Sequence, residues 1–145
     1  MKVLLPIAAL LAMAFLLVAA DPPAKVTFVD HDKVSAALAK GGPLVTAPDL
    51  LVSGSFRNKG GQVEVHDKET DIMYIVDGDA TFVTGGTMVG GKSTKAGQWL
   101  GSDIKGGEIH KLTKGDVIVI PAGTPHWFKE VPKTVSYYVV KVLKP

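Results

Sequence analysis

The stretch KGDVIVIPAGTPHWF, residues 114–128, decides the fold that this sequence predicts. It is an apolar run, then a turn that contains Pro121, Gly123 and Pro125, then His126 between a proline and a tryptophan. Proline fixes a backbone angle on either side of the turn, and glycine permits a conformation that other residues avoid. The pattern therefore predicts a strand, a rigid turn and an imidazole held with little freedom, as a metal site needs.

The pattern around this stretch is also that of β-structure. From Leu50 onward, short runs rich in Val, Ile, Thr and aromatic residues are separated by Gly, Asp and Pro, which is typical of strands and tight turns. Asp77-Gly78, between two such runs, predicts a hairpin, and Gly115-Asp116 predicts a second turn. The predicted strands cover residues 50–56, 62–66, 71–77, 79–84, 108–113, 116–120, 125–130 and 134–142. Short strands joined in this way predict an all-β sandwich or small barrel.

Two further elements are predicted before the β-region. Residues 25–29, KVTFV, predict a short strand. The next stretch, DHDKVSAALAKGG, predicts a short helix, because Asp30 or Asp32 can cap its start and Gly41 can end it. His31 lies at the entrance of this helix, and we expect it to face solvent or to act in capping.

Residues 84–107 do not follow the strand pattern, because they hold eight glycines in 24 residues and show no clear period. We expect a long loop, which inside a compact domain is usually functional or disordered. Gly90-Gly91-Lys92-Ser93 within it is not a phosphate loop, because an earlier glycine is missing at the required spacing and no helix follows.

The first 20 residues, MKVLLPIAALLAMAFLLVAA, predict a secretory signal peptide. A lysine precedes the apolar run, and small residues precede Asp21, as signal peptidase requires. The run is shorter than the roughly 20 residues that a membrane-spanning helix needs, although an uncleaved anchor is the alternative. We therefore expect a secreted protein, extracellular or periplasmic, with residues 21–145 as a single domain and no membrane contact after cleavage.

The composition excludes several classes of function. The net charge is +2 and the basic residues are scattered, so no basic stripe predicts a nucleic-acid partner. The chain has no cysteine, which excludes thiol catalysis and leaves packing to stabilise an exported domain without disulfides.

Strand alternation gathers polar side chains on one face of residues 62–66. Gln62, Glu64 and His66 share that face, since every second residue of a strand points the same way. His110 and His126 each share a face with an apolar residue two positions further along the chain, so we expect both imidazoles to point inward.

Several buried imidazoles on neighbouring strands predict a metal site, in preference to separate hydrogen bonds for each ring. A half-buried imidazole is costly without a partner, and one divalent cation satisfies several at once. Imidazole nitrogen combined with carboxylate or amide oxygen suits Mn, Fe, Ni, Cu and Zn. For a single histidine, the alternative is a hydrogen-bonded core residue.

The stretch quoted first resembles the second motif of the cupin superfamily. That motif is a glycine, a proline, a glycine and a histidine at fixed spacing, and this chain has Gly115, Pro121, Gly123 and His126 at that spacing. The asparagine that the family has further along is Glu130 here.

The first cupin motif is present in a less regular form. Asp71 and Gly78 match its acid and its final glycine, and the family's spacing leads back from Asp71 to His66 and Glu64. The resemblance thus implies that Glu64 replaces the family's first histidine and that Asp71 replaces its glutamate. Because aspartate is shorter, other side chains are candidates to complete the set. The candidate metal ligands are His66, His126, Glu64, His110, Gln62 and Asp71.

The resemblance implies a cupin-type jelly-roll barrel (a double-stranded β-helix) with a short N-terminal helix. It also implies one divalent transition metal ion per chain, with copper favoured and Fe, Mn, Ni or Zn as alternatives. Similarity to small secreted cupins suggests a metal-dependent oxidoreductase, in its most specific form a copper enzyme that cleaves a polysaccharide such as cellulose by oxidation. The alternatives are a non-catalytic metal- or sugar-binding module and a dioxygenase or isomerase acting on a small molecule.

Tyr74 and Glu64 are the candidate catalytic side chains beside this metal. Trp127 and Trp99 are candidates for stacking on sugar rings, although packing or a dimer interface explains Trp127 equally well. We expect strands 50–56 and 134–142 at a sheet edge, which needs cover. Cupin-like proteins often pair through such strands, so the resemblance also implies a homodimer.

Overall fold

A computed structural model describes residues 25–144 of the chain. The predicted signal peptide, residues 1–20, lies outside the described residues. The elements, in chain order, are α1 (His31–Lys40), β1 (Gly42–Thr46), β2 (Leu50–Arg57), β3 (Val63–His66), β4 (Glu69–Thr84), β5 (Thr87–Val89), β6 (Lys92–Lys95), β7 (Gln98–Gly101), β8 (Asp103–Lys105), β9 (Glu108–Thr113), β10 (Val117–Ile120), β11 (His126–Glu130) and β12 (Val135–Leu143). The prediction of an all-β barrel with a short N-terminal helix is confirmed.

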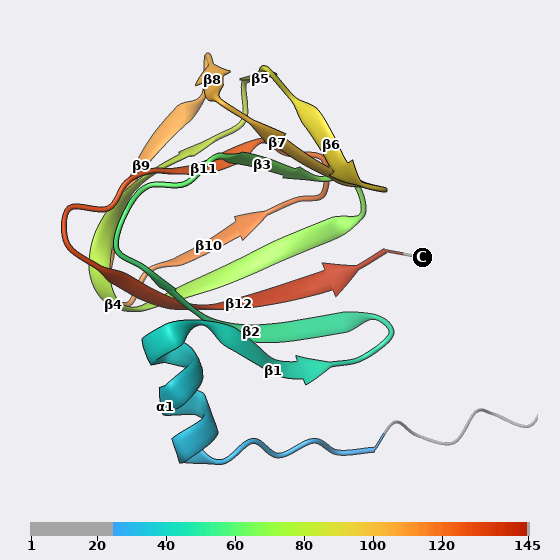
Figure 1. Cartoon of the computed structure of the whole chain (residues 1–145), viewed down its shortest axis with the longest axis vertical. Coiled ribbons are helices and arrows are strands. Elements are labelled where there is room, and N and C mark those ends of the chain that lie inside the picture. Colours follow the sequence, from blue (N-terminus) through green and yellow to red (C-terminus); the bar gives the residue numbers. More distant parts are fainter. Residues whose placement is uncertain (1–24, 145) are drawn as a thin grey trace, which may run out of the picture.

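The strands curl into a barrel whose two halves share one long strand, β4 (Figure 1). The first half of β4 lies between β12 and β10, and β2 and β1 continue the sheet beyond β12. Its second half lies between β11 and β9, and β3, β7 and β6 continue the sheet beyond β11. Since both sheets bend around one interior, side chains from distant parts of the sequence meet inside.

The hairpin predicted at Asp77-Gly78 is wrong, because β4 runs through it without turning back. Gly78 has a positive φ of 81°, and a Cβ there would collide with the backbone carbonyl of Thr134. Just before it, the pairing of β4 with β12 shifts register. Glycine here allows a bend that carries one strand from the first sheet into the second.

Aromatic side chains fill the centre of the barrel. The rings of Phe82 and Phe128 meet edge to face with centroids 4.7 Å apart, and the ring of Tyr137 lies 5.0 Å from that of Phe128. Ile75 and Val135 complete the fully buried apolar packing around them. This core fixes β4, β11 and β12 relative to one another, and the polar site lies beside it.

The helix prediction is confirmed at both ends. The side chain of Asp30 accepts a hydrogen bond from the backbone of Lys33, and Gly41 ends the helix with φ at 79°. The strand predicted at residues 25–29 is wrong, since the segment is extended but pairs with no strand and leaves Val26 and Phe28 almost fully exposed. None of the helices in residues 25–144 has the length and apolar character to cross a membrane.

The glycine-rich segment 84–107 is a set of short strands and not the loop that its composition predicts. β6 and β7 form a hairpin that extends the second sheet through β3, while β5 and β8 pair in a small sheet of their own. Seven of its eight glycines lie between these strands, and strands of three or four residues are too short to show a period of two.

Apart from the predicted runs 71–77 and 79–84, which are both part of β4, the strands predicted from Leu50 onward match the structure to within one residue at each end. The expected position of two of them at a sheet edge is wrong, because β2 is covered by β1 and β12 lies between β2 and β4. Exposed strand edges therefore no longer support a homodimer, which stays a prediction.

Candidate metal centre

Three strands bring the polar side chains together inside the barrel. β3 carries Glu64 and His66, β4 carries Asp71, and β11 begins with His126. Glu64 and His126 are direct partners across the β3–β11 pair. Alternation along β4 points Asp71 inward with its buried neighbours two and four residues on, as the spacing argument requires.

Both imidazoles are buried and each leaves one nitrogen without a partner. His66 and His126 are 8% and 4% exposed. The Nδ1 of His126 lies 3.0 Å from the carbonyl oxygen of Thr124, and the Nδ1 of His66 contacts the side-chain oxygen of Gln98. Because both partners are acceptors, each Nδ1 donates a hydrogen, and in a neutral imidazole Nε2 then carries the lone pair. These two Nε2 atoms have no hydrogen-bond partner among the described residues.

The two imidazoles lie close to each other and to a carboxylate. The imidazole centroids are 5.0 Å apart at 61°, and a carboxylate oxygen of Glu64 lies 3.5 Å from the Nε2 of His66. One ligand atom from each of Glu64, His66 and His126 lies within 4.8 Å of the others. Two orphaned imidazole nitrogens and a carboxylate oxygen are a donor set that fits a divalent transition metal.

Asp71 lies against the same nitrogens but is also held by a lysine. One of its oxygens is 3.6 Å from the Nε2 of His66 and 3.9 Å from that of His126. Both oxygens are 2.8 Å from the Nζ of Lys141, which also lies 3.0 Å from Glu69. His66, Glu69 and Asp71 form a second group whose spacing could hold a cation, so the lysine and a metal would compete for these carboxylates.

The pKa values of two groups follow from these contacts. Burial is the main cause that lowers the pKa of His126, although the Thr124 carbonyl and the carboxylate of Asp71 favour its charged form. The imidazole is therefore neutral at neutral pH, as a ligand must be. Burial would raise the pKa of Glu69, but its contacts with Lys141, His66 and Gln98 together leave that pKa below its usual value.

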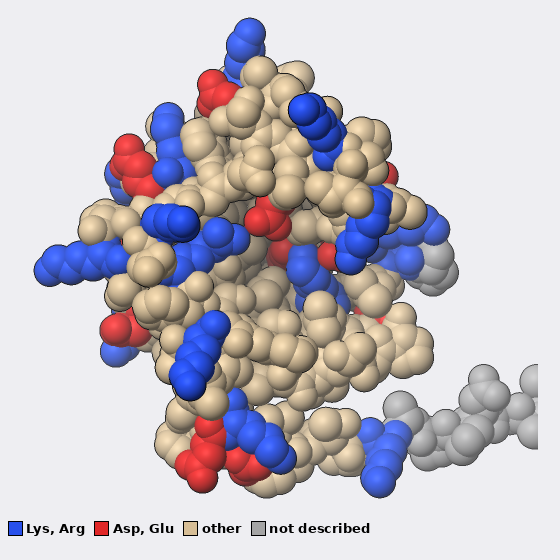
Figure 2. Space-filling view, viewed as in Figure 1, with Lys and Arg blue, Asp and Glu red and all other residues tan. Residues whose placement is uncertain are grey.

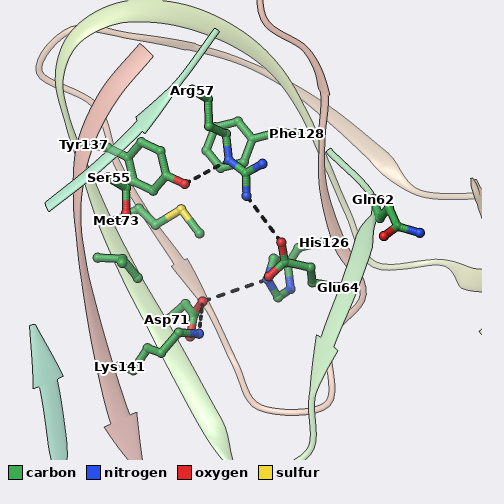
Figure 3. Close-up of a pocket in the computed structure, with 11 residues that line it drawn as sticks. Ser55, Arg57, Gln62, Glu64, Asp71, Met73, His126, Phe128, Tyr137 and Lys141 are labelled. Carbon is green, nitrogen blue, oxygen red and sulfur yellow. Dashed lines mark hydrogen bonds and ion pairs between the residues drawn. The ribbon is translucent and has the colours of Figure 1, made fainter. Parts of the chain in front are cut away.

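Three of the predicted site residues lie apart from this donor set. Tyr74 is 45% exposed and points away from the interior, because it is an odd number of residues from inward-facing Asp71 on the same strand, so the structure does not place it beside the donor set. His110 hydrogen-bonds through Nε2 to the hydroxyl of Thr84 at 2.8 Å and joins neither metal-spaced group of the described residues. Gln62 lines the cavity, but its amide points away from Glu64 in Figure 3.

The tryptophans have structural contacts of their own. Trp127 donates its ring N–H to the carbonyl of Gly61 at 2.7 Å, with the ammonium of Lys129 above its ring. Trp99 donates to the carboxylate of Asp67 and stays partly exposed. These contacts favour the packing interpretation of Trp127.

A cavity of about 180 Å³ opens beside the donor set. Figure 2 shows acidic and basic side chains together around a hollow in the middle of the face that it views. Figure 3 shows Arg57, Tyr137 and Ser55 on one side of the cavity and Glu64 and His126 on another. The lining residues are Ser55, Arg57, Gln62, Glu64, Asp71, Met73, His126, Phe128, Tyr137, Val139 and Lys141.

Sequence reasoning missed five of the side chains in and around the site: Arg57, Glu69, Gln98, Tyr137 and Lys141. None belongs to a motif, and Gln98 comes from the segment that was predicted as a loop. Two signals were present: Arg57 is the only arginine in the sequence, and alternation places Tyr137 and Lys141 on one face of residues 134–142.

Comparisons with known proteins agree with this architecture. The sequence profile of one family, described as Cupin, matches residues 23–145. No curated protein matches the chain. BH2720 from Bacillus halodurans is 17% identical with a TM-score of 0.57, over 81% of this chain and 82% of that one.

Two further solved structures are similar over a smaller share. The cupin domain of Cnp3 from Schizosaccharomyces pombe is 13% identical with a TM-score of 0.52, over 71% of this chain and 59% of that one. Peruvianin-I, a cysteine peptidase from Thevetia peruviana latex, is 16% identical with a TM-score of 0.44, over 66% of this chain and 51% of that one. The chain thus spans about half the length of Peruvianin-I. The likeness to BH2720 and to the Cnp3 domain, at 17% and 13% identity, shows the fold alone.

Proposed function

The chain belongs to the Cupin family, and on that premise we propose that it is a mononuclear metal-dependent oxidoreductase that acts on a small molecule inside the barrel. Family membership alone does not decide this, because cupins include enzymes and non-enzymatic storage proteins. The observation that carries the proposal is the pair of buried Nε2 atoms on His66 and His126. They have no hydrogen-bond partner among the described residues and lie 3.6 and 3.9 Å from the same oxygen of Asp71.

In this proposal His66, His126 and Glu64 hold the metal through two nitrogens and one oxygen. Gln98 and the carbonyl of Thr124 keep the two rings in the tautomer that leaves Nε2 free, as outer partners of metal-binding histidines do. Gln98 also donates to Glu69 at 2.7 Å, which fixes its own amide. A bound metal with three protein ligands would have open positions for oxygen or substrate and would supply redox or Lewis-acid chemistry.

Glu64 is the remaining candidate for a catalytic role. One of its oxygens lies near His66, while the other accepts a hydrogen bond from Arg57 at 3.3 Å. The carboxylate therefore has two separate tasks, one toward the donor set and one toward the cavity. A proton moved within the cavity would pass at the Glu64 oxygen that contacts Arg57, since Asp71 is already paired with Lys141.

Copper is the favoured metal, because imidazole sites bind Cu²⁺ more tightly than the other divalent metals of the first row. Iron, manganese, nickel and zinc suit the same donors.

Oxidative cleavage of a polysaccharide such as cellulose is the less favoured form. A polymer needs the metal at an open surface, and these nitrogens belong to side chains that are at most 8% exposed.

The test is metal analysis of the purified chain combined with product analysis. We expect about one metal ion per chain and oxygen consumption with a small organic substrate. Release of oxidised sugars from cellulose with copper and a reductant would support the polysaccharide form instead. Tight ligand binding without product would identify a binding module, and a chain that retains no divalent metal would overturn the proposal.

Two predictions about the protein's setting accompany this proposal. Secretion, extracellular or periplasmic, rests on the sequence of residues 1–20, and the homodimer rests on the resemblance. Edman sequencing of the N-terminus of the exported protein checks the first, and light scattering of the purified chain checks the second.

A further inference from the structure

The cavity wall away from the proposed donor set carries a guanidinium. It belongs to Arg57 on β2, the only arginine in the sequence. We propose that Arg57, Tyr137 and Ser55 form a subsite that binds the carboxylate of a small organic acid. The subsite extends the proposed function. It depends on that function only for where the reacting end of the acid lies.

The guanidinium is held in a fixed plane at the cavity. Its Nε donates to the hydroxyl of Tyr137 at 3.0 Å, one terminal nitrogen donates to Glu64 at 3.3 Å, and its central carbon lies 4.7 Å above the ring of Phe128. These contacts use two of the five N–H donors of arginine. No other hydrogen bond described for residues 25–144 uses the remaining three, and the planar fork of arginine matches the two oxygens of a carboxylate.

The hydroxyl of Tyr137 adds a second donor to the subsite. It accepts a hydrogen bond from Arg57, and no other contact described for residues 25–144 uses its own proton. The side chain is 5% exposed, so that proton needs an acceptor inside the cavity. A carboxylate oxygen beside Arg57 would accept it, and the hydroxyl of Ser55 lines the same wall.

The charge of the lining also favours an anion once a metal is bound. The cations Arg57 and Lys141 balance the carboxylates Glu64 and Asp71. A divalent metal would therefore leave excess positive charge, even when Glu69 beside Lys141 is counted. An organic anion reduces that excess, so metal and carboxylate should strengthen each other's binding.

The size of the cavity limits the ligand. Its volume is about 180 Å³, and a cavity of roughly 150 Å³ in another protein is known to hold benzene. The ligand should therefore have about six to ten non-hydrogen atoms. Met73, Phe128 and Val139 give the cavity an apolar wall. The class that fits is a monocarboxylic acid with a short apolar chain or a single ring.

Calorimetry on the full mature chain tests the subsite, with lactate, pyruvate and benzoate against their neutral amides, with and without Cu²⁺. We expect at least one acid to bind roughly 10- to 100-fold more tightly than its amide. Arg57→Gln should remove this preference, and Tyr137→Phe should weaken acid binding about 3-fold or more. Lys105→Gln, which removes an exposed charge outside the cavity, should change neither.

Chemical modification gives a second readout that needs no variant and no activity. Phenylglyoxal reacts with guanidinium groups, and the chain offers a single target. The binding acid should slow modification of Arg57, and its amide should not. Because this comparison of acid with amide uses the unchanged chain, it tests the subsite even if Arg57→Gln fails to fold. Circular dichroism would reveal such a failure.

The outcomes separate this subsite from the metal site. An Arg57-dependent preference for acids in a chain that takes up no metal would support the subsite and overturn the proposed function. A chain that takes up metal but binds acids and amides equally, with unprotected Arg57, would overturn the subsite and leave the metal site in place.

Discussion

Replacing His126 with alanine is expected to abolish metal loading while the barrel stays folded. The change removes one of the two imidazole nitrogens that are buried without a hydrogen-bond partner in residues 25–144. Loss of an outer partner of a metal ligand typically costs 10- to 100-fold in affinity, so loss of the ligand itself should exceed about 100-fold. Elemental analysis and competition with a chelating dye measure the effect.

His110→Ala is the matched control for this experiment. It also removes an imidazole from the barrel, but His110 bonds to Thr84 and lies outside both metal-spaced groups of the described residues. Gln98→Leu should give an intermediate loss of about 10- to 100-fold, because it frees the ring of His66 without removing it. Equal metal content in His126→Ala and the unchanged chain would contradict the assignment of this nitrogen as a ligand.

Lys141→Met is expected to destabilise the metal-free protein by about 3 kcal/mol. The change leaves the carboxylates of Asp71 and Glu69 in the barrel without their cation, and breaking a buried ion pair costs about 3–5 kcal/mol. The lower end applies because Glu69 keeps some contact with water. Urea denaturation of the metal-free chain measures the free energy of unfolding.

Added metal should rescue this variant more than it stabilises the unchanged chain. A divalent cation would take the place of the missing ammonium beside Asp71, whose side chain is 3% exposed. Lys114→Met is the matched control, since Lys114 pairs with Asp77 at 3.7 Å on the surface and should change stability by less than about 0.5 kcal/mol. Similar losses in the two variants would show that burial of the Lys141 pair contributes nothing.

The parts of the site that depend on short spacing could be predicted from the sequence. His126 follows from the prolines and glycine just before it, and His66 and Asp71 follow from their spacing to Gly78. The structure places these three side chains together. The alternation rule also held the information to exclude Tyr74, because an inward Asp71 on a continuous strand requires an outward Tyr74.

Other parts of the site depend on contacts that no local pattern encodes. Arg57 and Tyr137 are 80 residues apart and meet only because β2 and β12 pair along their length. Gln98 reaches His66 from a hairpin whose strands are too short to show a period. Asp77-Gly78 misled the prediction because a glycine with positive φ serves a bend in a strand as well as a hairpin turn.

The most direct test of the account is an anomalous difference map from a crystal of the chain loaded with copper. It should show one metal ion within about 2.0–2.2 Å of the Nε2 atoms of His66 and His126 and of an oxygen of Glu64. A metal bound elsewhere, with both Nε2 atoms still free of any partner, would contradict the central claim that these imidazoles form a metal centre.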